Sequence, residues 1–96
     1  MSYIQVIEIQ SDDFEGIERA HETWLAATVG QRTVESVRVC RDRDRPDTYV
    51  LIVEFPSAEA AAINDNLPAT GQIAAALAAL ATKPLTFMNL DLIRQD

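Results

Sequence analysis

The chain has 96 residues, of which 48% are hydrophobic and 24% are charged, and its formal net charge is −7. This length predicts one domain covering residues 1–96, and the composition is that of a folded globular protein. The negative charge argues against nucleic-acid binding and against binding to anionic membranes, because both need a basic surface.

The cysteine content and the hydropathy of the chain indicate the cellular compartment in which it is expected. Cys40 is the single cysteine, so no disulfide can form within the chain. The first residues, "MSYIQVIEIQSDD", lack the basic region and the long apolar core of a signal peptide. The alanine-rich run from Ala74 to Ala81 is too short and too weakly apolar to span a bilayer. We therefore expect a soluble, cytoplasmic protein.

The chain opens with a predicted strand and a predicted helix. Tyr3 to Gln10 is rich in β-branched residues, which favour a strand. Apolar residues then recur at helical spacing from Asp13 to Val29. Ser11 or Asp12 is suited to cap the start of this helix, and Gly30 is suited to its end.

A hairpin follows. We predict a second strand from Thr33 to Arg41, a turn at "RDRDRPD" whose charges partly cancel, and a third strand from Tyr49 to Phe55. The third strand, "YVLIVEF", is apolar at nearly every position. Successive side chains of a strand point to opposite faces, so both faces of this strand are expected to be buried.

The last part of the chain predicts an interrupted helix and a fourth strand. Ser57 is suited to cap a helix that starts with "AEAAAIN", and Pro68 interrupts it. A second helical segment is expected from Thr70 to Thr82, and Pro84 prevents its continuation. The segment "LTFMNLDLI", from Leu85 to Ile93, is the predicted fourth strand.

The resulting order is β-α-β-β-α-β, which predicts an α+β fold of the ferredoxin-like, split βαβ type. Its usual form is a four-stranded antiparallel sheet with the helices on one face. The other face is also apolar, since Met88, Leu90 and Leu92 alternate along the fourth strand with a second set of mostly apolar residues. A second copy of the chain is the simplest cover, so we expect a homodimer that forms through the sheet face.

The element order, together with "DTYVLIVEFPSAEAAAINDNLPAT", resembles the antibiotic biosynthesis monooxygenase superfamily of dimeric α+β barrel proteins. The likeness lies in an apolar strand ending in an aromatic residue, followed by a Ser-x-Glu-Ala segment that opens a helix. The resemblance implies a homodimer with a pocket between sheet and helices. Some relatives oxidise aromatic polyketides with molecular oxygen and no bound metal or flavin, others degrade haem, and others have no established activity.

The haem-degrading branch fits this sequence poorly. The polar amide of that branch falls near Gln5, and its aromatic residue falls at about Asn64. Its iron-ligating histidine falls at about Ile73, whose side chain cannot bind a metal. Haem degradation is therefore disfavoured, and we expect no cofactor.

Candidate site residues are few. His21, the only histidine, shares a helix face with Trp24, so it is either a pocket base that acts on a phenolic substrate or a half-buried core residue. Trp24 is either a stacking wall for an aromatic ligand or core bulk. Gln5, on an apolar strand face, either pairs with the backbone at the sheet edge or points into a polar pocket.

Two asparagines lie in "NDNLP", close to the helix interruption. Asn64 and Asn66 are typical of turns and helix ends, which is their structural interpretation. The functional alternative is that one of the asparagines lines the pocket and orients a carbonyl or hydroxyl group of the substrate.

Glu54 is the one carboxylate within the apolar third strand. It is either a general base with a raised pKa or, as we prefer, the partner of Arg38 on the paired strand. The sequence has no set of residues spaced to bind zinc or iron, and its three glycines form no phosphate-binding loop.

Two functions remain open. The first is a cofactor-independent, monooxygenase-like enzyme acting on an aromatic or phenolic compound. In it, His21 serves as base and Gln5, Trp24, Asn64 and Asn66 bind the substrate. The alternative is a catalytically silent homodimeric binding or interaction module of the same fold.

Overall fold

The computed structural model describes all residues from 1 to 96, and its element order confirms the expected ferredoxin-like arrangement. The elements are β1 (Tyr3–Gln10), α1 (Phe14–Ala27), β2 (Ser36–Arg41), β3 (Thr48–Phe55), α2 (Ala58–Asp65), α3 (Pro68–Leu80) and β4 (Thr86–Asp91). None of the helices has the length and apolar character that crossing a membrane requires.

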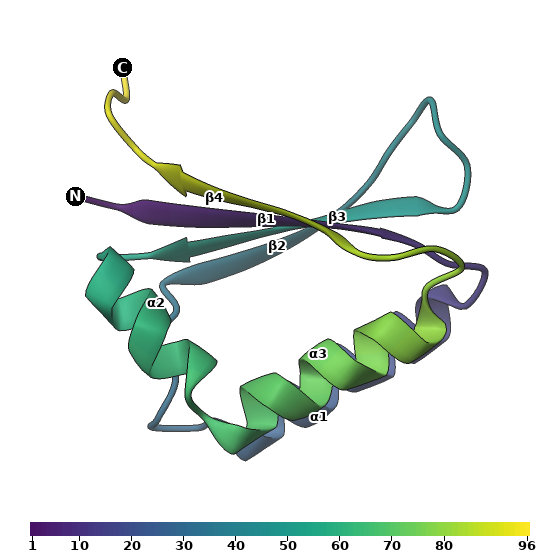
Figure 1. Ribbon diagram of the computed structural model, residues 1–96, viewed down its shortest axis with the longest axis horizontal. Coiled ribbons are helices and arrows are strands. Elements are labelled where there is room, and N and C mark those ends of the chain that lie inside the picture. The colour runs from purple at the N-terminus through teal and green to yellow at the C-terminus, as the bar shows by residue number, and fades with distance from the viewer.

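The four strands form one antiparallel sheet in the order β2-β3-β1-β4, so β1 and β3 are central. All three helices lie on one face of this sheet, and the opposite face is open (Figure 1). The register places Gln5 of β1 between Val53 of β3 and Asn89 of β4. Side chains that share a face alternate along each strand, so these three residues all point to the helix side.

The cap of α1 differs from the expectation of Ser11 or Asp12. The N-cap is Asp13, whose carboxylate accepts a hydrogen bond of 2.9 Å from the backbone N–H of Gly16. Ser11 has another role, because its hydroxyl donates to the backbone carbonyl of Leu80 at 2.8 Å and accepts from the backbone of Asp13. Ser11 therefore joins the start of α1 to the end of α3, a contact between segments distant in the sequence.

Pro68 acts as the start of a helix rather than only as a break. It occupies the first turn of α3, where a missing backbone N–H leaves no helix hydrogen bond unmade. The expected second helix is thus two helices, with α2 capped at Ser57 as predicted and α3 starting two residues before Thr70. The chain bends sharply between them (Figure 1).

Two separate groups of buried residues form the core between helices and sheet. The first packs α1 and α3 onto one end of the sheet, and its buried members are Ile9, Ile17, Tyr49, Leu51 and Leu77. The second packs α2 onto the other end, and its buried members are Val53, Phe55, Ala60 and Ala61. Burial of such apolar surface is the main stabilising contribution to the fold. The bend between α2 and α3 lies above the junction of the two groups.

The outer sheet face, opposite the helices, is apolar at its centre. Met88 and Leu90 of β4 keep 50% and 41% of their surface exposed. The apolar residues of this face are Ile4, Val6, Val50, Ile52, Met88 and Leu90.

Ion pairs lie toward the ends of this face. As expected, Glu54 pairs with Arg38 on the neighbouring strand, with 3.8 Å between the carboxylate and the guanidinium. Glu8 pairs with Arg45. The apolar centre is thus flanked by neutralised charges.

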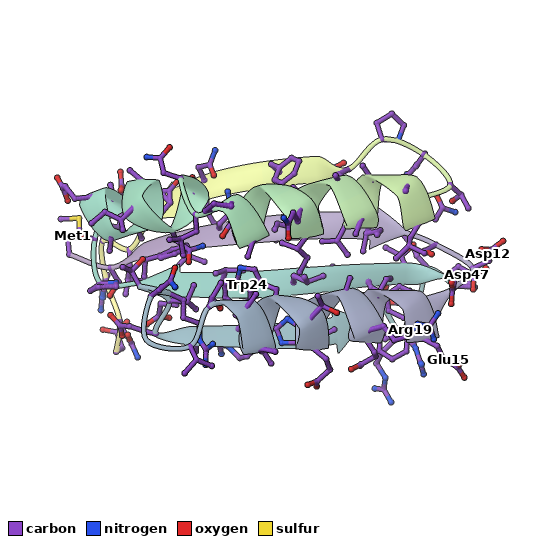
Figure 2. The ribbon with its side chains drawn as sticks, turned by 90° about the horizontal axis from the view of Figure 1, so that it is seen from below. Met1, Asp12, Glu15, Arg19, Trp24 and Asp47 are labelled. Atoms are coloured by element: carbon purple, nitrogen blue, oxygen red, sulfur yellow. The ribbon has the colours of Figure 1, made fainter.

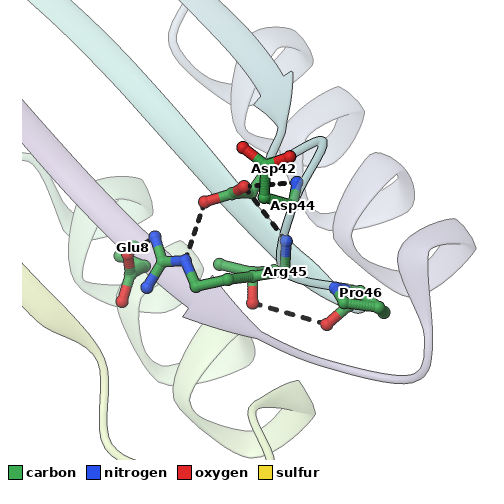
Figure 3. A network of polar contacts seen from close by, with 6 residues as sticks. Glu8, Asp42, Asp44, Arg45 and Pro46 are labelled. Atoms are coloured by element: carbon green, nitrogen blue, oxygen red, sulfur yellow. Dashed lines mark hydrogen bonds and ion pairs between the residues drawn. The ribbon is translucent and has the colours of Figure 1, made fainter.

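The turn between β2 and β3 is organised around Asp42 (Figure 3). One carboxylate oxygen accepts hydrogen bonds from the backbone N–H groups of Asp44 and Arg45, at 2.9 and 3.1 Å. The other accepts from the Arg45 guanidinium at 2.7 Å. These bonds favour the charged carboxylate, so the pKa of Asp42 lies below its usual value.

The hydrogen bonds of Asp42 predict how the stability of the fold changes in acid. Because these hydrogen bonds hold the pKa of Asp42 below the usual value of an aspartic acid, the charged carboxylate stabilises the fold at neutral pH. The contribution is lost as the pH falls through the depressed pKa. The variant Asp42→Asn should therefore unfold more easily than the wild-type chain at neutral pH, and the difference should shrink in increasingly acidic buffer.

Urea unfolding followed by circular dichroism between pH 2 and pH 7 measures this difference. The matched control is Asp44→Asn, because the Asp44 side chain takes no part in the hydrogen bonds of the turn. A constant difference between Asp42→Asn and the wild-type chain at every pH would contradict the assignment.

Candidate functional site

A cavity of about 150 Å³ lies between the helices and the sheet, where the two groups of core residues meet. Of its 17 lining residues, 12 are hydrophobic, and the polar ones are Gln5, His21, Asn64, Asp65 and Thr70. An apolar cavity of roughly 150 Å³ is large enough to hold one benzene ring. The site is therefore an apolar space for a small ring, with a few polar groups that can orient it.

His21 reaches the cavity from α1 and is half-buried. Its ring lies near the indole of Trp24, one helical turn further on, with 6.0 Å between ring centroids and 22° between ring planes. Around His21, the side chains that form hydrogen bonds within the chain are those of Thr23, Trp24 and Thr28, and the His21 ring forms none. The His21 ring nitrogens thus have no partner in the chain, and a ligand can engage them as proton donor or acceptor.

Trp24 lies between the two long helices (Figure 2), and only 6% of its surface is exposed. Its indole N–H donates a 3.1 Å hydrogen bond to the Thr70 hydroxyl in the first turn of α3. The Arg32 guanidinium lies 5.7 Å from the centre of the ring. Trp24 is thus both a core residue and a lining residue, and its contacts hold α1 and α3 in a fixed relation at the cavity.

Gln5 lines the cavity from β1, on the helix side of the sheet. Its amide nitrogen donates a 3.2 Å hydrogen bond to the side-chain oxygen of Asn89 on β4. Gln5 thus contacts the cavity, but its amide pairs with a side chain of β4 rather than with backbone at a sheet edge, and the lining around it is mostly apolar.

Asn64 and Asn66 have different surroundings. Asn64 is 4% exposed and lines the cavity, and its side-chain oxygen is buried with no hydrogen-bond partner in the chain. Asn66 is exposed and lies outside the lining. It is the C-cap of α2, where its backbone N–H donates to the carbonyl of Ala62 at 3.2 Å. Of the two asparagines, the structure brings only Asn64 together with His21 and Trp24.

Asp65 and Thr70 line the cavity but were not candidates from the sequence. Both lie within the turn-like segment around Pro68, so their residue types indicated only a bend. Placing Pro68 at the start of α3 would have put Thr70 in its first turn. Partial burial raises the pKa of the Asp65 carboxyl group. No three His, Cys, Asp or Glu side chains gather in a group that could hold a metal ion.

Comparisons with solved structures concern the whole chain. It is similar to Rv0793 from Mycobacterium tuberculosis, with a TM-score of 0.81, 14% identity and coverage of 99% of this chain and 98% of that one. A structure named as an antibiotic biosynthesis monooxygenase has a TM-score of 0.75 and 15% identity, over 98% of this chain and 100% of that one. A dimeric ferredoxin-like protein of unknown function from Jannaschia sp. CCS1 has a TM-score of 0.81 and 12% identity, over 96% and 100%.

The sequence matches no protein-family model and no curated protein. The structural likenesses cover nearly the full length of both partners at low identity, so they concern the fold. The resemblance expected from the sequence is confirmed at that level: this chain has the fold of structures named as antibiotic biosynthesis monooxygenases.

The Trp24–Thr70 hydrogen bond gives a prediction. Thr70→Val removes the acceptor and leaves the buried indole N–H unpaired, which costs about 1–3 kcal/mol of unfolding free energy. Thr70→Ser keeps the hydroxyl and should lose much less. Chemical denaturation of both variants, followed by the emission of the single tryptophan, measures the difference. Equal stabilities of the two variants would show that the bond is unimportant.

Proposed function

We propose that this chain is a monooxygenase-like enzyme that acts, without a cofactor, on a small aromatic or phenolic compound bound between sheet and helices. The observation that carries the proposal is an apolar, ring-sized cavity in which His21 has no hydrogen-bond partner. Similarity of fold to a structure named as an antibiotic biosynthesis monooxygenase also supports it.

The proposed chemistry needs little from the protein beyond a base and a dry, shaped space. His21 takes a proton from the bound substrate, and the resulting anion passes an electron to molecular oxygen. The substrate radical and superoxide combine at a carbon that carries hydrogen, and the peroxide formed takes back the proton held by His21. Its O–O bond then breaks with loss of the C–H proton, which leaves a carbonyl oxygen on the substrate and releases water. The apolar walls reduce the contact of the anion with water, and Trp24 and Gln5 limit the orientations of the ring.

The volume of the cavity limits the substrate. About 150 Å³ accommodates one aromatic ring, so a fused polycyclic compound would have to extend through the open side of the cavity. We therefore expect single-ring phenols to be better substrates than anthrone-like compounds.

Oxygen uptake with a panel of single-ring phenols tests the proposal. If His21 is the base, His21→Gln should lower the rate by about 100-fold or more, because general-base catalysis typically contributes that much. The matched control is Glu22→Gln, which changes the exposed neighbouring residue and should leave the rate unchanged.

An equal rate in wild type and His21→Gln would remove His21 from the chemistry. Saturable binding of phenols without any oxygen uptake would instead favour the alternative, a silent binding module. The cavity supplies one imidazole and one carboxyl group, so that alternative is chemically reasonable.

We also propose that two copies associate through the outer sheet face. Met88 and Leu90 on this face are 50% and 41% exposed, and the solved structure from Jannaschia with the same fold is named as dimeric. A two-fold axis through this face would bring the same apolar residues of two chains together.

Light scattering after gel filtration tests this association. Met88→Lys places a charge among the apolar residues of the outer face, where Met88 is 50% exposed on β4, and should convert the dimer into a monomer. Ile63→Lys is the control, because Ile63 is 56% exposed but belongs to α2 on the opposite side of the sheet. A monomeric wild-type chain, or a dimer that survives Met88→Lys, would contradict the proposal.

A further inference from the structure

Asn64 lines the cavity, and its side-chain oxygen is buried without a hydrogen-bond partner in the chain. Leaving such an atom unpaired is costly, and a buried unpaired polar atom in a folded protein needs an explanation. The obvious structural explanation does not hold, since the C-cap of α2 is Asn66. An amide oxygen can only accept a hydrogen bond, so whatever satisfies it must supply a donor.

Thr70 provides the complementary group. Its hydroxyl oxygen accepts from the Trp24 indole N–H at 3.1 Å, and the hydroxyl donates to no acceptor in the chain. A hydroxyl group has one proton to donate besides its two lone pairs. The proton of Thr70 is therefore available to a ligand in the cavity that it lines.

Asn64 and Thr70 come from the two sides of the bend at Pro68, Asn64 from the last turn of α2 and Thr70 from the first turn of α3. Two residues that line the cavity at one bend of the chain thus carry an unpaired acceptor and an unused donor. The rest of its lining is largely apolar.

We propose that this pair selects a ligand with a neutral hydroxyl group on a single apolar ring. The ligand hydroxyl donates its proton to the Asn64 oxygen and accepts the Thr70 proton, while the ring occupies the apolar space. This inference rests on the proposed function in that it assigns the ligand of the same cavity. An ether, which has no proton to donate, would leave the Asn64 oxygen unpaired, as would a phenolate.

The inference also constrains the base. A hydroxyl that stays bound to Asn64 keeps its proton, so the proton that His21 removes must come from a second acidic group of the same compound. Phenols with a second acidic hydrogen are then better substrates than phenol itself, which serves as a binding probe.

Binding of phenol, anisole and toluene, followed by calorimetry, tests the selection. The wild-type chain should bind phenol at least about 10-fold more tightly than anisole, because an unpaired buried acceptor costs roughly a tenfold factor or more. In Asn64→Leu this preference should fall below about 2-fold. Asn66→Leu, the same substitution two residues away on the surface, should keep the wild-type preference.

Unfolding measurements without ligand show whether a variant binds less phenol only because it is less well folded. Asn64→Leu removes an unpaired buried oxygen and should be at least as stable as the wild-type chain, whereas a structural asparagine would make this variant less stable. Thr70→Ser keeps the donor and should bind phenol as the wild type does. Reduced phenol binding by Thr70→Ser would argue against a role of the hydroxyl.

Three results would overturn the inference: no binding of phenol, equal binding of phenol and anisole, or a preference that survives Asn64→Leu. Tighter binding of anisole than of phenol would overturn it as well. These outcomes are separate from failure of the proposed function, which oxygen uptake measures. Selective phenol binding without turnover of any compound would retain the hydroxyl site and remove the enzyme.

Discussion

The structure depends on one constraint, which is that the central strands β1 and β3 carry apolar side chains on both faces. The helices of this 96-residue chain cover only one of these two faces. The helix side receives α1, α2 and α3, and the outer face stays open within one chain (Figure 1). Apolar sheet surface of this kind is stable when it is covered. The helices cover one apolar face of the sheet, and the proposed dimer covers the other.

The cavity follows from the way in which the helices cover their face. The bend at Pro68 divides the covering layer, so that α3 packs with α1 over one group of core residues and α2 packs over another. At the junction the lining comes from both groups, with Leu51 from the first and Val53 from the second. The Trp24–Thr70 hydrogen bond fixes the helices at this junction. The site is thus built from the place where the core is least continuous.

The sequence predicted the order of the strands and the sheet, because runs of β-branched and apolar residues are a local signal. Two strands are shorter than predicted, since β2 begins at Ser36 rather than Thr33 and β4 spans Thr86–Asp91 rather than Leu85–Ile93. The bounds of β1 were predicted without error, and the pair of Glu54 with Arg38 followed from strand pairing alone. The cap of α1 was predicted one or two residues early, because Ser11 is used in a contact with Leu80 that only the tertiary fold creates.

The site was less predictable. Asn64 and Asn66 have the same residue type in the same turn-like segment, and only the exact end of α2 decides which one faces the cavity. Thr70 carried no signal of its own until Pro68 was known to begin α3. Long-range contacts, which are not encoded in any short motif, determine these roles.

The most direct test of the account is whether the cavity between helices and sheet is the ligand site. The single tryptophan gives one indole N–H resonance in a nitrogen-15 NMR spectrum. Titration with phenol should shift this Trp24 signal and the side-chain amide of Asn64 saturably, and leave the backbone amides of Asn66 and of the β2–β3 turn in place. Shifts confined to other surfaces, or none at all, would contradict the account.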